Sequence, residues 1–152
     1  MKKNLVIIGG SGLIGANLAD YLFKKNFNII IIDLKKRHER FDFYKSDLTN
    51  TKKFTKTIDL IFKKYSKIEA VINCAYPKNK NWGKKFEFLK PADVKENLYN
   101  QLGSYILSSQ IIIKKFLKQK SGNLIFFSSI QGIAAPKFDH YLGTKLASPI
   151  EY

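Results

Sequence analysis

The stretch Asn4-Leu-Val-Ile-Ile-Gly-Gly-Ser-Gly-Leu-Ile-Gly15 decides the fold of this chain. Residues 4–8 form an almost continuous apolar run, which is typical of a strand buried on both faces of a sheet. Glycines at positions 9, 12 and 15 follow, and from Leu13 to Phe23 apolar residues recur at helical spacing. The sequence therefore predicts a strand, a tight glycine turn and a helix in direct succession.

Strand-like and helical segments alternate through the rest of the chain. We expect further strands at Asn28–Leu34, Phe41–Lys45, Glu69–Asn73 and Asn123–Ser128, and further helices at Asn50–Lys64 and about Ala92–Lys118. Strands that alternate with helices require right-handed crossovers, and therefore a parallel sheet with helices on both faces. The predicted fold is a Rossmann-type, doubly wound α/β sheet in three layers, formed by one domain over residues 1–152, with residues 76–90 as a surface loop beside the site.

Length and composition exclude several classes of protein. The chain has 152 residues, of which 45% are hydrophobic, and this suits one globular domain. A single Cys excludes an internal disulfide framework and a multi-cysteine metal site, so we expect no metal. Apolar runs such as 29–32 are far too short to cross a bilayer, and no signal-peptide pattern is present. We expect a cytoplasmic protein without a membrane partner.

The formal net charge of +15 raises the question of a nucleic-acid partner. The excess comes from 25 Lys against 2 Arg, and the lysines are scattered as pairs, such as Lys24-Lys25 and Lys114-Lys115, instead of forming a tract. Arginine provides most of the bidentate contacts that read bases and phosphates. We therefore interpret the charge as a solvated, lysine-rich surface and expect no specific nucleic-acid site.

The glycine turn is the first feature that predicts a ligand. Small residues there let the backbone turn tightly, approach a pyrophosphate closely and pack the helix on the sheet. Asp33 closes the second strand about 20 residues later, where a carboxylate accepts hydrogen bonds from ribose hydroxyls and favours NAD. Lys35, Lys36 and Arg37 offer an alternative that holds the 2′-phosphate of NADP. A turn without a ligand, and an Asp33 that only caps its own turn, also stay open.

In the order of its motifs the chain resembles the short-chain dehydrogenase/reductase family along essentially its whole length. The resemblance implies that the cofactor loop is formed by Gly9, Ser11, Gly12, Leu13, Ile14 and Gly15. It also implies that Asp47 and Leu48 meet the adenine ring. Asn73 and Ala75 match the family's Asn-Asn-Ala-Gly stretch, although the sequence here is Asn73-Cys-Ala-Tyr76 and departs at the second and fourth positions.

The same resemblance implies hydride transfer between a nicotinamide and the carbonyl or alcohol group of a small-molecule substrate. Asn100 matches the family's catalytic asparagine, which steadies a proton-relay water. Ser129, favoured over Ser128 by its spacing to Gly132, matches the serine that polarises the substrate oxygen. A tyrosine is the general acid/base in this scheme, and a neighbouring lysine lowers its pKa from its usual value near 10.

Two tyrosines compete for the acid/base role. Tyr141 and Lys145 form a Tyr-x-x-x-Lys pair, but Gly143 is a poor residue for the interior of a helix. Residues 148–151, Ser-Pro-Ile-Glu, have the pattern of an N-cap, a proline at the first helical position and a capping-box Glu. This pattern begins a helix that carries Tyr152 in its first turn, so we favour Tyr152, whose lysine would be position 156.

Within the family, residues 135–152 look like the oxidoreductases of flagellin modification and sugar biosynthesis. Because members of the family typically continue well past this point, we expect an amino-terminal part that stops at the start of the catalytic helix and is inactive alone, and a parent protein that forms homo-oligomers. Two alternatives stay open: a dinucleotide-binding fragment without catalysis, and a nucleotide-sugar epimerase or dehydratase of the extended type.

Overall fold

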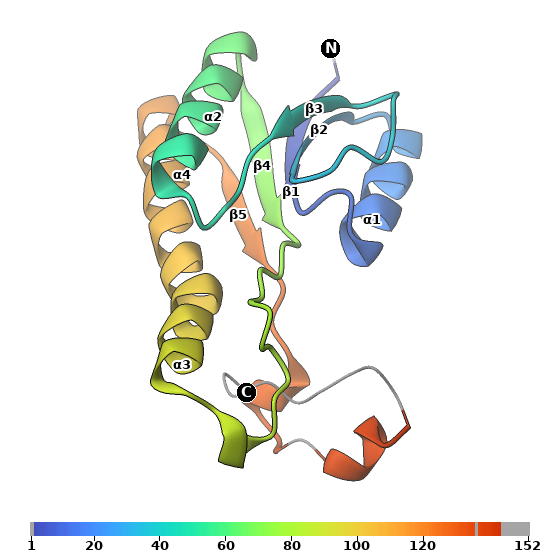
Figure 1. Cartoon of the computed structure of the whole chain (residues 1–152). Helices are drawn as coiled ribbons and strands as arrows, with labels where there is room; N and C mark the ends of the chain where they lie inside the picture. Colours follow the sequence, from blue (N-terminus) through green and yellow to red (C-terminus); the bar gives the residue numbers. More distant parts are fainter. Residues whose placement is uncertain (1, 136, 144–152) are drawn as a thin grey trace.

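The computed structural model describes residues 2–135 and 137–143, which form a five-stranded parallel sheet with helices on both sides (Figure 1). The strands are β1 (Asn4–Ile8), β2 (Asn28–Asp33), β3 (Asp42–Lys45), β4 (Ile68–Asn73) and β5 (Asn123–Phe126), in the spatial order β3-β2-β1-β4-β5. The α-helices are α1 (Leu13–Lys24), α2 (Thr51–Lys64), α3 (Pro91–Leu98) and α4 (Ser104–Gln119). This arrangement confirms the predicted Rossmann-type α/β fold.

The sheet lies between two hydrophobic layers, with α2 and α4 on one face and α1 on the other (Figure 1). In β1, Val6 and Ile8 pack with α2 and α4, whereas Leu5 and Ile7 pack with α1. Successive side chains of a strand point to opposite faces, so a strand covered on both sides needs apolar residues at every position. This requirement explains the unbroken apolar runs at the start of the chain.

Helix α2 supplies the centre of the first layer. Phe54, Ile58 and Ile61 recur at helical spacing and are fully buried. The helix begins after Asn50, whose side chain accepts a hydrogen bond from the backbone N–H of Lys53 at 3.0 Å. This cap satisfies one of the donors left free at a helix start, so the predicted start at Asn50 is the N-cap and the helix itself begins one residue later.

Three strands are shorter than predicted, the second by one residue because it ends at Asp33. The third begins at Asp42, and Phe41 instead packs its ring edge to face with Phe23 at a centroid distance of 5.6 Å. Phe41 is buried in the layer beneath α1, so its side chain serves the core from outside the strand. The fifth strand ends at Phe126, and Ser128 therefore lies in the segment that follows the strand.

The single long helix predicted from Ala92 to Lys118 is three segments, because a π-helix over Tyr99–Gly103 separates α3 from α4. A Cβ at Gly103 would lie 2.9 Å from the ring of Tyr99, so glycine leaves room for that ring. The hydroxyl of Tyr99 donates to the carbonyl oxygen of Thr49 at 3.0 Å. The wider turn thus places Tyr99 against the loop before α2.

Part of the predicted catalytic machinery falls on residues that the structure does not describe. The helix expected from Ser148, together with Lys145 and Tyr152, lies outside the described ranges. Within the described ranges, no helix is long and apolar enough to span a membrane.

We expect Phe54→Ala to lower the free energy of unfolding by about 3–5 kcal/mol, because it removes a fully buried ring from the layer under α2 and α4. Urea unfolding followed by far-UV circular dichroism measures this loss. Leu60→Ala is the matched control on the same helix, since Leu60 is 59% exposed and its loss should cost less than about 0.5 kcal/mol. Equal losses in the two variants would contradict this account of the core.

Candidate active site at the carboxyl ends of the strands

The glycine turn after β1 is packed against two other backbone segments. Gly9 has φ 73°, a conformation that side chains other than glycine rarely adopt, and a Cβ there would lie 2.5 Å from the backbone nitrogen of Ala75. A Cβ at Gly15 would overlap the carbonyl oxygen of Gly9. Glycine at these positions therefore lets the turn, the start of α1 and the loop after β4 meet with no side chain between them.

Asp33 ties this turn to the end of β2. One of its carboxylate oxygens accepts from the backbone N–H of Ser11 at 2.9 Å, and the other accepts from the N–H of Leu34 at 2.6 Å. The hydroxyl of Ser11 donates to the carbonyl oxygen of Lys35 at 2.6 Å. Asp33 therefore caps its own turn, as the alternative interpretation of the sequence expects. Each carboxylate oxygen keeps a further lone pair for a ligand hydroxyl.

A cavity of about 670 Å³ opens at the carboxyl ends of the strands, beside the glycine turn. In a parallel α/β sheet this is the edge at which ligands bind. It is lined by residues from four segments: Ile8, Gly9 and Ser11–Ile14; Ile32–Lys35; Ser46–Leu48; and Cys74–Lys78. Every residue predicted to bind the cofactor lines this cavity except Gly15 and Asn73.

Gly15 and Asn73 do not line the cavity but support segments that do. Gly15 gives the glycine turn room to pack on α1. Asn73 is 1% exposed, and its side-chain oxygen accepts from the N–H of Ala75 at 3.0 Å, which holds the loop after β4 in place.

Two polar residues after β3 face the same cavity. Asp47 uses one carboxylate oxygen to accept from the N–H and the hydroxyl of Thr49, at 2.9 and 2.8 Å. Ser46 is 7% exposed, and within the described part of the chain its buried hydroxyl has no hydrogen-bond partner. A buried polar atom normally has one. A ligand with a polar group would satisfy Ser46, a residue that the sequence analysis missed although it is a small polar residue directly after a strand.

These residues fit a dinucleotide. The glycines leave the backbone open to close approach by a diphosphate, and Asp33 has lone pairs for ribose hydroxyls. A polar atom of the ligand could form the hydrogen bond that the Ser46 hydroxyl lacks among the described residues. When bound, a nicotinamide dinucleotide accepts or delivers a hydride.

A second cavity of about 710 Å³ adjoins the first. It is lined by Ile14, Cys74–Tyr76, Leu98, Gln101, Leu102, Tyr105, Phe126–Ser129 and Gly132. Ile14 and Cys74–Tyr76 line both cavities, so the two share this part of their wall. The hydroxyl of Ser129 accepts from the N–H of Gln131 at 3.2 Å and thereby begins the 3-10 helix Ile130–Gly132.

The structure brings only part of the predicted catalytic set to these cavities. Ser129 lines the second cavity, whereas Asn100 and Tyr141 line neither. Asn100 belongs to the π-helix, and its carbonyl oxygen accepts from the hydroxyl of Ser104. Tyr141 ends the 3-10 helix Phe138–Tyr141, the red segment that lies below the sheet in Figure 1.

Cys74 stands where the family pattern has an asparagine. Burial raises the pKa of its thiol to about 11, so the group is a neutral thiol at physiological pH. A neutral, half-buried thiol is a weak nucleophile. Cys74 therefore serves as a small apolar part of the shared wall.

The parallel order of the strands, the glycine turn and the cavity at the carboxyl edge define a Rossmann-type α/β protein. The family model for short chain dehydrogenases matches residues 3–148. The chain therefore belongs to the short-chain dehydrogenase family.

Two curated relatives are similar along almost the whole chain. Post-translational flagellin modification protein A of Campylobacter coli is 34% identical over 165 aligned positions, which cover 99% of this chain and 64% of that protein. Sorbitol-6-phosphate 2-dehydrogenase of Klebsiella pneumoniae is 27% identical, with coverage of 97% and 60%. The chain thus spans less than two thirds of the length of these relatives.

Solved structures superpose well on this chain. A short chain dehydrogenase from Leptospira borgpetersenii with bound NAD+ superposes with a TM-score of 0.80 at 25% identity, over 95% of this chain and 58% of that one. ElxO with NADP bound gives a TM-score of 0.78 at 22% identity, over 90% and 59%. The second likeness shows the fold alone.

Gly9→Ala should lower the free energy of unfolding by about 1–3 kcal/mol for the strained positive φ alone. The overlap of the added Cβ with the backbone of Ala75 should increase this loss. Thermal and urea unfolding measure the loss. In the control Gly132→Ala, the added Cβ meets nothing within 4 Å, so stability should stay nearly unchanged. If Gly9→Ala were as stable as the control, the close packing described for the turn would be wrong.

Proposed function

We propose that this chain forms the cofactor-binding part of an NAD-dependent oxidoreductase that transfers a hydride between a nicotinamide and a carbonyl or alcohol. The observation that carries the proposal is that Asp33, at the end of β2, lines the same cavity as the glycine turn. A carboxylate at that position accepts hydrogen bonds from the ribose hydroxyls of NAD and repels the 2′-phosphate of NADP. Membership of the dehydrogenase family supports the reaction class.

NAD should bind roughly tenfold or more tightly than NADP, the factor expected from one charge-assisted hydrogen bond. Calorimetric titration with both cofactors measures the ratio. Asp33→Asn, which keeps an acceptor for the Ser11 N–H but removes the charge, should bring the two affinities closer, and Asp33→Ala should shift the balance further toward NADP. Tighter binding of NADP by the unaltered chain, through Lys35–Arg37, would reject the assignment.

We assign Ser129 to polarising the substrate oxygen, Asn100 to steadying a proton-relay water, and a tyrosine to the proton transfer itself. The choice of Tyr152 over Tyr141 is supported by the backbone after the 3-10 helix. Leu142 is extended, with φ −61° and ψ 134°, and Gly143 has φ 69°. No α-helix therefore runs through residues 141–143, whereas a tyrosine and a lysine four residues apart need one helix to share a face.

In the whole protein, Tyr152→Phe should reduce hydride transfer by a factor of about 10²–10⁴, the usual contribution of general acid/base catalysis. Tyr141→Phe should keep most of the activity. Both variants are compared at saturating NAD by the absorbance of the reduced cofactor. The reverse pattern would assign the role to Tyr141 and Lys145.

The 152-residue chain alone should bind cofactor without measurable turnover, and robust turnover would refute its assignment as a partial enzyme.

A sugar of a surface glycan is the proposed substrate class. The names of the two relatives support it, since one acts in flagellin modification and the other on sorbitol 6-phosphate. A dinucleotide-binding fragment without catalysis, and a nucleotide-sugar epimerase or dehydratase, are the competing proposals. The epimerase would retain its cofactor and show no net change in reduced cofactor when substrate is added, which separates it from the dehydrogenase.

We further propose that the whole protein forms a homo-oligomer in the cytoplasm. Helices α3 and α4 and the π-helix between them support self-association, because exposed apolar side chains recur along them every four or seven residues, at Leu98, Leu102, Ile106, Ile113 and Leu117. Contiguous apolar surface of this kind marks association sites.

A further inference from the structure

The loop after β4 carries a cation that the cofactor motifs of the sequence do not include. Lys78 lines the first cavity together with the glycine turn. Its ammonium lies over the ring of Trp82, 4.3 Å from the centroid, and within the described part of the chain it forms no ion pair with a carboxylate. Within the described residues, Lys78 is therefore a cation at the cavity that lies against an aromatic face and pairs with no carboxylate.

This loop is held in place by its neighbours. Gln101 donates to the carbonyl oxygen of Pro77, and Tyr105 donates to that of Ala75. Further along, Asn81 donates to the buried carboxylate of Asp93 at 2.6 Å, a bond that holds the pKa of Asp93 below its usual range. Hydrogen bonds to neighbouring elements thus hold the loop on both sides of Lys78, whereas the exposed side chain of Lys78 is held by no ion pair within the described residues.

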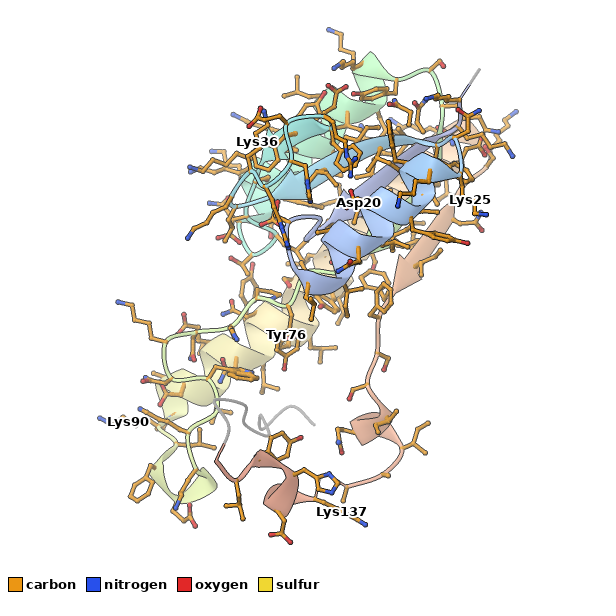
Figure 2. The ribbon with its side chains drawn as sticks, turned by 90° about the vertical axis from the view of Figure 1, so that its right-hand side faces the viewer. Asp20, Lys25, Lys36, Tyr76, Lys90 and Lys137 are labelled. Carbon is orange, nitrogen blue, oxygen red and sulfur yellow. The ribbon has the colours of Figure 1, made fainter. Side chains whose placement is uncertain are left out.

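Trp82 is held in the same way. Its indole N–H donates to the hydroxyl of Tyr76 at 3.3 Å, and the two rings meet edge to face at 6.0 Å. Figure 2 shows Tyr76 between the sheet and the region around Lys90 and Lys137. The ring face of Trp82 is therefore presented to Lys78 while Tyr76 lines the cavity wall.

The position of the loop indicates which part of a bound dinucleotide would lie near Lys78. Ala75 touches Gly9, so the segment that leads to Lys78 begins against the turn that would hold a diphosphate. Lys35, the other lysine of the lining, instead follows Asp33 at the ribose end. Lys78 is exposed and Trp82 is half-buried, so water weakens the contact of the ammonium with the ring, whereas a charge-assisted bond to a phosphate oxygen is stronger.

We propose that Lys78 is a cofactor-binding residue whose ammonium leaves the face of Trp82 and pairs with the diphosphate of the dinucleotide. The proposal rests on the dinucleotide-binding function proposed above. It makes Trp82, the single tryptophan of the chain, a reporter of diphosphate binding.

The test titrates the full 152-residue chain with NAD by calorimetry, and with ADP by tryptophan fluorescence, since ADP carries the diphosphate without the nicotinamide. Lys78→Met should raise the Kd for NAD about tenfold and make it less sensitive to salt, because a screened charge pair is lost. Lys78→Arg should restore most of the affinity. Lys80→Met, on the same loop but outside the cavity lining, should change the Kd less than twofold. ADP should change the emission of Trp82 in the unaltered chain and much less in Lys78→Met.

Equal affinity and equal salt dependence of Lys78→Met and the unaltered chain would overturn this proposal and leave the dinucleotide function standing. Unchanged emission of Trp82 at saturating ADP would likewise overturn the movement of the ammonium. If the unaltered chain, folded by circular dichroism, bound no NAD at all, the proposed function and this inference would both fail.

Discussion

The contact between Gly9 and Ala75 is the constraint on which the site depends. Two loops from neighbouring strands meet backbone to backbone there, and any side chain at position 9 would force them apart. Asn73 secures one side by accepting from the N–H of Ala75, and Asp33 secures the other by accepting from the N–H of Ser11. These bonds hold in place two of the segments that line the cavity beside the turn.

Most of the fold could be predicted because it depends on short-range patterns. The run Val6-Ile7-Ile8 is apolar at every position since both faces of β1 are covered, and the burial of Phe54, Ile58 and Ile61 follows from helical spacing. The π-helix before α4 could not be predicted in this way. In this π-helix the hydroxyl of Tyr99 donates to the carbonyl oxygen of Thr49, 50 residues earlier in the chain, and a contact between residues so far apart leaves no period in the sequence.

The candidate site was predictable to the extent that it follows strands. Asp33 closes a predicted strand, Asp47 and Ser129 closely follow two others, and all three line a cavity. The sequence analysis missed Ser46 and Lys78 for different reasons. Ser46 follows a strand but belongs to no motif. Lys78 lies on a loop whose carbonyl groups accept hydrogen bonds from Gln101 of the π-helix and Tyr105 of α4, and such contacts leave no local pattern in the sequence. The role of Tyr152 stays a prediction, and so does that of Asn100.

The wall shared by the two cavities constrains which substitutions the site can accept during evolution. Ile14 and Cys74–Tyr76 face both the cofactor side and the Ser129 side. A substitution at these positions changes the lining of both cavities at once, so under the proposed function the fit of the substrate and the fit of the cofactor are coupled. Leu98 and Leu102 line the second cavity and not the first, so a substitution there changes one lining and leaves the other as it is.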